Sequence, residues 1–157
     1  MKGERRLARW VETSDPASQV ESRALPLDSG VIGEQTTVRI PSTLYHKLKS
    51  ASPEAQRAFD ILATRMSHVF PFWKGTRDDF RFSNSDERVV FILTPTTNYI
   101  RVEIHPGLTG YRNRQHLFPE ETSPRSGYPG IALWPRVRVS GSSEAAAIAD
   151  DVERGIR

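Results

Sequence analysis

Apolar side chains recur along the chain at two spacings, which predict helices in some segments and strands in others. Four of them repeat every three or four positions, the period of one helix face: Ala55, Phe59, Leu62 and Met66. Ser52-Pro53-Glu54 comes just before and combines an N-cap, a proline at the first helical position and an early acid. We therefore expect a helix from about Pro53 to His68 that turns its apolar face towards a core.

Two further helices are expected on either side of the sheet segments. Residues 36–40, TTVRI, form a β-prone run that Pro41 ends, and a short helix with Leu44 and Leu48 on one face follows. Near the other end of the chain, Ser142 or Ser143 begins a helix. Its buried stripe is spaced by three or four residues: Ala145, Ile148, Val152 and Ile156.

Strand patterns occupy the middle of the chain. Residues 79–82 form a short strand, and residues 88–94, RVVFILT, are almost continuously apolar, as in a central strand covered on both faces. After a turn at 95–98, residues 99–105 alternate between apolar and polar, which predicts an antiparallel hairpin. A last strand is expected over 131–139, at an edge or with a bulge because of its proline.

These elements predict an α+β fold: a helix pair, an antiparallel meander of three to four strands, and a C-terminal helix packed on one sheet face. We expect a single domain over residues 36–157 and a flexible N-terminal tail over residues 1–35. A short helix over residues 4–12 is possible in the tail. Its Trp10 either docks the tail onto the domain or anchors a partner protein. Residues 106–130 are expected to form a long Gly/Pro-rich loop.

Composition limits the classes of protein that fit. The 157 residues suffice for one domain, and the absence of cysteine excludes disulfides and thiolate chemistry. There is no apolar run long enough for a transmembrane helix and no secretory signal pattern, so we expect a cytoplasmic protein without a membrane partner. The net charge is +3, and its basic residues are 18 arginines and 4 lysines. Arginine suits planar and phosphate-like partners, although a GC-rich genome also raises arginine content.

The alternation of the strands gathers polar residues on the sheet face away from the helices. The candidate ligand-binding residues on that face and in the following loop are Arg81, Tyr99, Arg101, His105, Arg112, Arg114, Trp134, Arg136 and Arg138. Guanidinium groups bind phosphate or carboxylate, and flat aromatic rings stack on bases. The alternative is an ordinary solvated face whose arginines pair with Glu103, Glu120 and Glu121.

No complete catalytic motif is present, and neither a catalytic residue, a metal ligand nor a cofactor is expected. Phosphate-binding glycine loops and the G-x-S-x-G elbow are absent. Glu103 and His105 share a strand face but lack a clear third metal ligand. Asp78 or Asp79, followed by Glu103, resembles the acid spacing of restriction-type nucleases. The lysine expected two residues after the glutamate is replaced here by His105, which weakens a nuclease interpretation.

Residues 46–157 resemble an uncharacterised bacterial domain family of unknown function that is often attached to nuclease-like or "predicted transport" proteins. The similarity is carried by order and hydrophobic pattern in three segments: ASPEAQRAFDILATRM, VVFILTPTTNYIRVEIHP and ALWPRVRVSGSSEAAAIADDVERGI. The resemblance implies an accessory α+β domain of bacteria or their phages. It implies no catalytic residues.

Three functions remain open from the sequence. The first is a non-enzymatic accessory binding domain that holds an anionic ligand, with nucleic acid as the favoured partner, on the arginine and aromatic face. The second is a protein–protein adaptor that docks through residues 1–35 or through the same face, with Leu7, Trp10 and Trp134 as anchors. The third is a divergent metal-dependent, nuclease-like hydrolase centred on Glu103 and His105.

Overall fold

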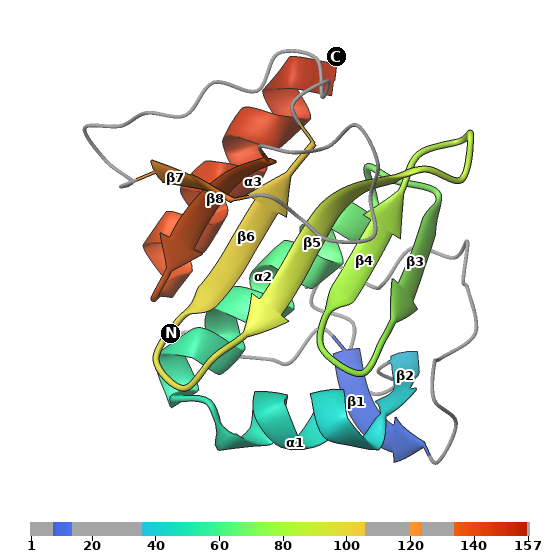
Figure 1. Cartoon of the computed structure of the whole chain (residues 1–157), viewed down its shortest axis with the longest axis vertical. Helices are drawn as coiled ribbons and strands as arrows, with labels where there is room; N and C mark the ends of the chain where they lie inside the picture. Colours follow the sequence, from blue (N-terminus) through green and yellow to red (C-terminus); the bar gives the residue numbers. More distant parts are fainter. Residues whose placement is uncertain (1–7, 14–35, 106–119, 124–133, 157) are drawn as a thin grey trace, which may run out of the picture.

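One antiparallel sheet organises the fold, with two helices behind it and a third helix beside a small parallel sheet (Figure 1). The computed structural model describes residues 8–13, 36–105, 120–123 and 134–156. In chain order, its elements are β1 (Ala8–Thr13), β2 (Thr36–Pro41), α1 (Ser42–Ser50), α2 (Pro53–Ser67), β3 (Phe72–Gly75), β4 (Phe80–Ser83), β5 (Val89–Pro95), β6 (Ile100–Ile104), β7 (Glu120–Ser123), β8 (Trp134–Val139) and α3 (Ser142–Ile156). The predicted α+β class and the helices on one sheet face are confirmed.

Within the described residues, the large sheet has six strands in the order β3-β4-β5-β6-β8-β7, with every neighbouring pair antiparallel. Two of its strands were not predicted: β3 (Phe72–Gly75), and β7, which lies in the expected 106–130 loop. Because of Pro135, the last strand was expected at an edge or with a bulge; the edge position was wrong, because β8 lies between β6 and β7. Its pairing with β6 runs only from Arg136 to Val139, so Pro135 lies outside that part of the ladder.

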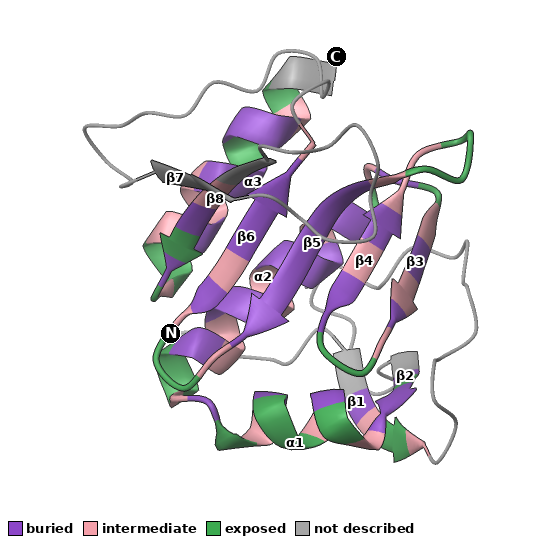
Figure 2. Cartoon of the chain, in the orientation of Figure 1, coloured by how far each residue is buried: buried purple, intermediate pink, exposed green. Residues whose placement is uncertain are grey.

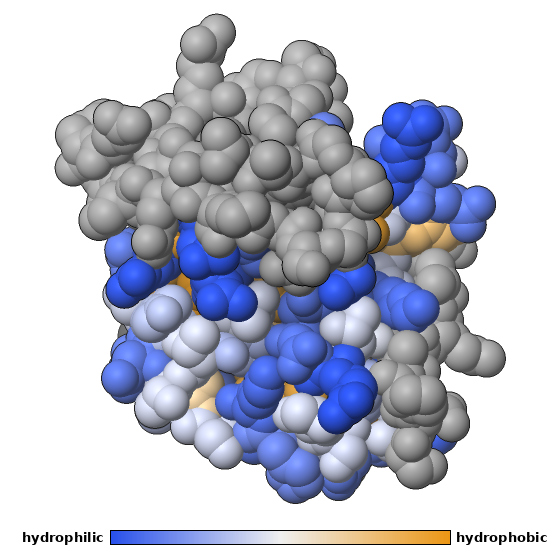
Figure 3. Space-filling view, viewed as in Figure 1, coloured by the Kyte–Doolittle hydropathy of each residue, from blue (hydrophilic) through white to orange (hydrophobic). Residues whose placement is uncertain are grey.

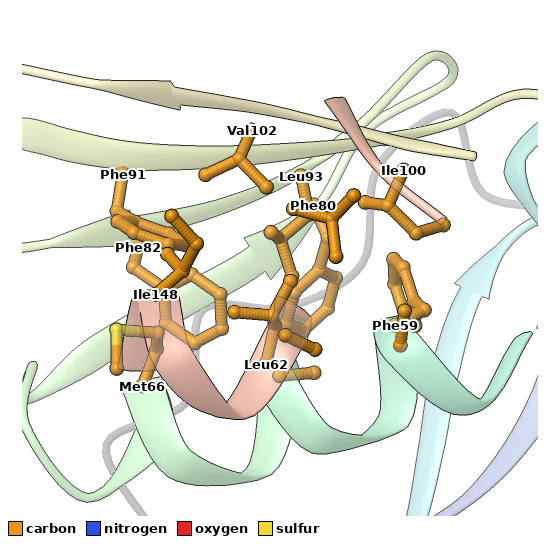
Figure 4. Close-up of a cluster of buried hydrophobic side chains, with 14 of the residues drawn as sticks. Phe59, Leu62, Met66, Phe80, Phe82, Phe91, Leu93, Ile100, Val102 and Ile148 are labelled. Carbon is orange, nitrogen blue, oxygen red and sulfur yellow. The ribbon is translucent and has the colours of Figure 1, made fainter. Parts of the chain in front are cut away.

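The core lies between the sheet and the two helices behind it. Phe59, Leu62 and Met66 of α2 and Ile148 of α3 point towards side chains of β4, β5 and β6 (Figure 4). The four residues of the predicted α2 stripe are fully buried: Ala55, Phe59, Leu62 and Met66. Figure 2 shows that burial is most continuous along β5 and β6. Burying this apolar area stabilises the fold and holds the sheet rigid behind its other face.

Local capping chemistry fixes the ends of the helices. The Ser52 hydroxyl accepts a 3.2 Å hydrogen bond from the Ala55 backbone N–H, and Pro53 occupies the first turn as predicted. At the start of α3, Glu144 accepts a 2.8 Å hydrogen bond from the Ser140 hydroxyl and a 3.1 Å bond from its backbone N–H. The helix itself begins at Ser142, as predicted.

The N-terminal segment departs from the prediction of a flexible tail. Ala8–Thr13 form strand β1, which pairs in parallel with β2, so a helix over residues 4–12 was wrong for the described part. Trp10 is only 3% exposed and packs edge-on against Phe59 and Phe80, at centroid distances of 5.1 and 5.3 Å. Trp10 therefore docks this segment into the core and is not available as a surface anchor for a partner. Residues 1–7 and 14–35 lie outside the described residues.

Candidate functional site

The outer face is defined here as the side of the antiparallel sheet that turns away from α2 and α3. Strand register sets a row of paired residues across it: Lys74, Arg81, Ile92, Glu103 and Arg136. A neighbouring row runs from Thr94 through Arg101 to Arg138. Because directly opposite residues of an antiparallel pair point to the same side, Arg81, Arg101, Arg136 and Arg138 share this face. Where described residues are visible in Figure 3, most of them are hydrophilic.

The buried carboxylate of Glu103 lies near two of these arginines, Arg101 and Arg136. Glu103 is 1% exposed, with Arg101 Nε 3.9 Å from its Oε1 and Arg136 Nη2 3.8 Å from its Oε2. Both distances are ion-pair distances but exceed the range of a hydrogen bond. The Nε atoms of Arg101 and Arg136 are buried, and neither has a hydrogen-bond partner among the residues that the structure describes. Electrostatic attraction therefore holds Arg101 and Arg136 near Glu103, and within the described residues it leaves their two Nε donors without an acceptor.

Arg138 adds a third guanidinium group beside this pair. It lies directly opposite Arg101 in the β6–β8 ladder and is exposed. Its guanidinium carbon lies 5.2 Å from the centroid of the Tyr99 ring, within the range of a cation–π contact. The arginine cluster, meaning Arg101, Arg136 and Arg138, thus brings together three guanidinium groups, two of them within ion-pair distance of Glu103 and the third in contact with the Tyr99 ring.

Arg81 belongs to a separate part of the outer face. Its Nε donates a 2.7 Å hydrogen bond to Asp79 Oδ1, and Asp79 is 2% exposed. The Thr76 hydroxyl donates a further 2.7 Å bond to the same carboxylate oxygen. Arg81 lies on β4 and Arg136 on β8, with β5 and β6 between them. Strands β4 and β8 are therefore three sheet spacings apart, about 14 Å. The predicted binding residues therefore form two groups.

The remaining predicted residues are only partly described. Tyr99 and His105 are half-buried at the two ends of β6, where the His105 backbone N–H donates a 2.8 Å bond to Val90. Arg112 and Arg114 lie outside the described residues. Trp134 begins β8, but its side chain is outside the described part of the structure, as are the side chains of Glu120 and Glu121.

The centre of the outer face is more buried than the sequence led us to expect. Ile92 is 0% exposed, Thr94 is 6% exposed and Glu103 is 1% exposed, although polar alternation predicted a solvated face. The signal for this was the continuous apolar run of residues 88–94, which predicted a strand covered on both faces. Of the described arginines on this face, Arg138 is exposed, and Arg81, Arg101 and Arg136 are half-buried.

The hydrolase hypothesis gains no additional ligands from the structure. Among the described residues, no group of three or more histidine, aspartate or glutamate side chains is placed to hold a metal ion. The carboxylates of Asp79 and Glu103, which the nuclease comparison paired, are each close to an arginine. Asp79 comes just before β4 and Glu103 lies on β6, so β5 separates them.

Comparison with protein-family models, with curated proteins and with solved structures found no match. The resemblance of residues 46–157 to an uncharacterised bacterial domain family therefore stays a prediction. In the part of the chain that the structure describes, no helix is both long and apolar enough to cross a membrane.

Proposed function

We propose that this domain is a non-catalytic binding module that holds nucleic acid through the arginine cluster of the outer face. The observation that carries the proposal is the direct cross-strand pairing of Arg101 with Arg138, next to Arg136. Like charges placed directly opposite each other in a sheet cost stability. Glu103 offsets part of this positive charge, and a bound phosphate would offset more of it.

The unsatisfied donors support the same function. Buried polar groups almost always find a hydrogen-bond partner, so an unpaired buried donor suggests a missing water, ion or ligand atom. As far as the described residues go, Arg101 Nε and Arg136 Nε are two such donors, and both lie near the Glu103 carboxylate. Phosphate oxygens accept hydrogen bonds from guanidinium groups in a planar, bidentate geometry.

The contact between Arg138 and Tyr99 favours nucleic acid over a simple anion. A guanidinium plane is itself a stacking surface for an unpaired base, and an aromatic ring beneath it keeps that plane oriented. Single-stranded nucleic acid offers both the phosphate and the exposed base faces that this arrangement would hold.

Fluorescence anisotropy with labelled single-stranded DNA and RNA of about 12 nucleotides tests the proposal. We expect affinity to fall steeply between about 50 and 200 mM salt, because cations that neutralise phosphates release counterions. The double variant Arg136→Gln with Arg138→Gln is expected to weaken binding to all sequences and to reduce the slope of log affinity against log salt by about 2.

The double variant Arg57→Gln with Arg154→Gln is the matched control, because it removes two positive charges from α2 and α3, on the other side of the sheet. It is expected to leave the salt slope nearly unchanged. Salt-insensitive binding, or equal binding by the wild type and the double variant at Arg136 and Arg138, would contradict the proposal. If inorganic polyphosphate bound with the same affinity as the oligonucleotides, the anion site would stand, but nucleic acid would be refuted as its specific ligand.

A further inference from the structure

A second site lies on the other part of the outer face, over β3, β4 and the start of β5. It is a cavity of about 220 Å³. Its lining residues are Phe72, Trp73, Lys74, Thr76, Arg81, Ser83, Glu87 and Val89. None of them belongs to the arginine cluster, so the cavity can be considered independently of the proposed function.

The positive end of the cavity is formed by a second like-charged pair. Lys74 of β3 lies directly opposite Arg81 of β4. Arg81 is held by the buried carboxylate of Asp79 at 2.7 Å, whereas no carboxylate of the described residues pairs with Lys74. Placing two cations opposite each other costs stability unless an anion lies near them. The Lys74 ammonium group is therefore the position in the cavity best suited to a ligand carboxylate.

Beside the two cations, the cavity has an apolar part formed by one row of paired residues that also carries a hydroxyl group. Phe72 pairs with Ser83 across β3 and β4, and Ser83 pairs with Val89 across β4 and β5. These three residues are half-buried and lie one row away from Lys74 and Arg81. A ligand that reaches Lys74 with its charged group would rest its apolar part against Phe72 and Val89.

We infer that this cavity binds a small organic monocarboxylate with a flat apolar body, such as an aromatic acid. The carboxylate lies at Lys74 beside Arg81, and the ring lies between Phe72 and Val89. The volume is below that of typical pockets for drug-sized ligands, which limits the ligand to about one ring. Exposed Glu87 at the lining adds a negative charge, which disfavours ligands with a second anionic group.

Isothermal titration calorimetry with benzoate as the probe tests the inference, and benzamide serves as its uncharged isostere. Benzoate is expected to bind saturably, and benzamide to bind about tenfold more weakly or not at all. Lys74→Gln is expected to weaken benzoate binding by about tenfold. Lys74→Arg is expected to retain it. Glu87→Gln is expected to strengthen it about two- to threefold, because an exposed repulsive charge is removed.

Lys49→Gln on α1 is the matched control and is expected to change nothing, because Lys49 does not line the cavity. Lys74→Gln should fold normally, since it removes a like-charge repulsion. Absence of saturable benzoate binding, equal binding of benzamide, or unchanged affinity in Lys74→Gln would each overturn the inference. Lys74→Gln is also expected to keep its affinity for oligonucleotides, so failure of this site and failure of the proposed function can be distinguished.

Discussion

The indole Nε1 of Trp10 donates a 2.7 Å hydrogen bond to Asp60 Oδ1, which joins strand β1 to helix α2 across fifty positions of sequence. The same indole ring packs edge-on against two phenylalanines of the core. A segment that composition alone would assign to a tail is thus part of the hydrophobic core. Loss of the Trp10 ring or of the β1 segment is therefore expected to lower the stability of the domain.

Trp10→Ala is expected to destabilise the domain by about 3–5 kcal/mol, because it removes a large buried ring and leaves a cavity. Trp10→Phe keeps most of the packing and loses the hydrogen bond to Asp60, so a cost of about 1–2 kcal/mol is expected. Urea unfolding followed by circular dichroism measures both. If deleting residues 1–13 leaves the unfolding midpoint unchanged, the docking of β1 does not stabilise the fold.

Arg65 of α2 links this helix to α3 through hydrogen bonds and ion pairs. Arg65 donates from Nε to Glu153 Oε2 at 3.0 Å and from Nη1 to the Ala146 carbonyl at 3.3 Å, and its Nη2 bonds to Asp150 and Glu153. The hydrogen bonds with Glu153 raise the pKa of Arg65 above its ordinary value, so the group stays charged.

Arg65→Lys keeps the charge but cannot reproduce the planar fork, and a loss of about 1–2 kcal/mol is expected. Arg65→Ala should cost more, because Glu153 then loses its partner in a half-buried position. A double-mutant cycle with Glu153→Gln isolates the pairwise energy. Strictly additive effects of the two substitutions would show that the contact contributes nothing.

The turn between β4 and β5 holds a left-handed residue. Glu87 has φ of 59°, and the Asn84 side chain accepts hydrogen bonds from the backbone N–H groups of Asp86 and Arg88, at 3.0 and 3.1 Å. In the left-handed backbone region, the Cβ atom of glutamate is sterically unfavourable, whereas glycine has no Cβ atom. Glu87→Gly is therefore expected to stabilise the domain by about 0.5–1 kcal/mol, measured as a higher unfolding midpoint. The neighbouring Arg88→Gly serves as the control and should destabilise or be neutral.

A surface ion pair gives a pH dependence of definite sign. Lys47 donates a 3.1 Å hydrogen bond to Asp78 Oδ1, which holds the pKa of Asp78 below its ordinary value. The folded state then binds this proton less readily than the unfolded state. The contribution to stability is present above the unfolded pKa of about 4 and is lost as the pH falls through the lower folded pKa.

Both side chains are largely exposed, at 41% and 73%, so we expect less than about 1 kcal/mol from this pair. Asp78→Asn should remove this part of the acid dependence and leave the rest of the pH profile intact. Denaturant unfolding between about pH 2 and 6 measures it. Identical acid profiles at low salt for the variant and the wild type would contradict the assignment.

Local signals sufficed for much of this fold. The Ser52-Pro53 cap and the period of α2 depend on residues within a few positions of each other, and so does the alternation of β6. The packing of Trp10 depends on parallel pairing of β1 with β2, which no local pattern reports. Strand β7, only four residues long and polar, carries no hydrophobic alternation to reveal it.

The candidate site was predictable to the same extent. Alternation alone places Arg101, Arg136 and Arg138 on one face, and the structure shows that arrangement. Burial of Glu103 between two guanidinium groups depends on cross-strand register and on neighbours distant in sequence. The like-charged pairs, Arg101 with Arg138 and Lys74 with Arg81, could be predicted only from the same cross-strand register.

Glu103 is expected to stabilise the fold while opposing the proposed ligand. Glu103→Gln removes the only buried carboxylate within ion-pair distance of Arg101 and Arg136 among the described residues, so stability should fall by about 1–3 kcal/mol. The same change removes a negative charge that competes with phosphate, so affinity for single-stranded nucleic acid should rise and its salt slope should steepen. Unfolding and anisotropy measured on one preparation separate the two effects. A parallel loss of stability and affinity would mean that Glu103 orients the arginines for the ligand, contrary to the competition argued here.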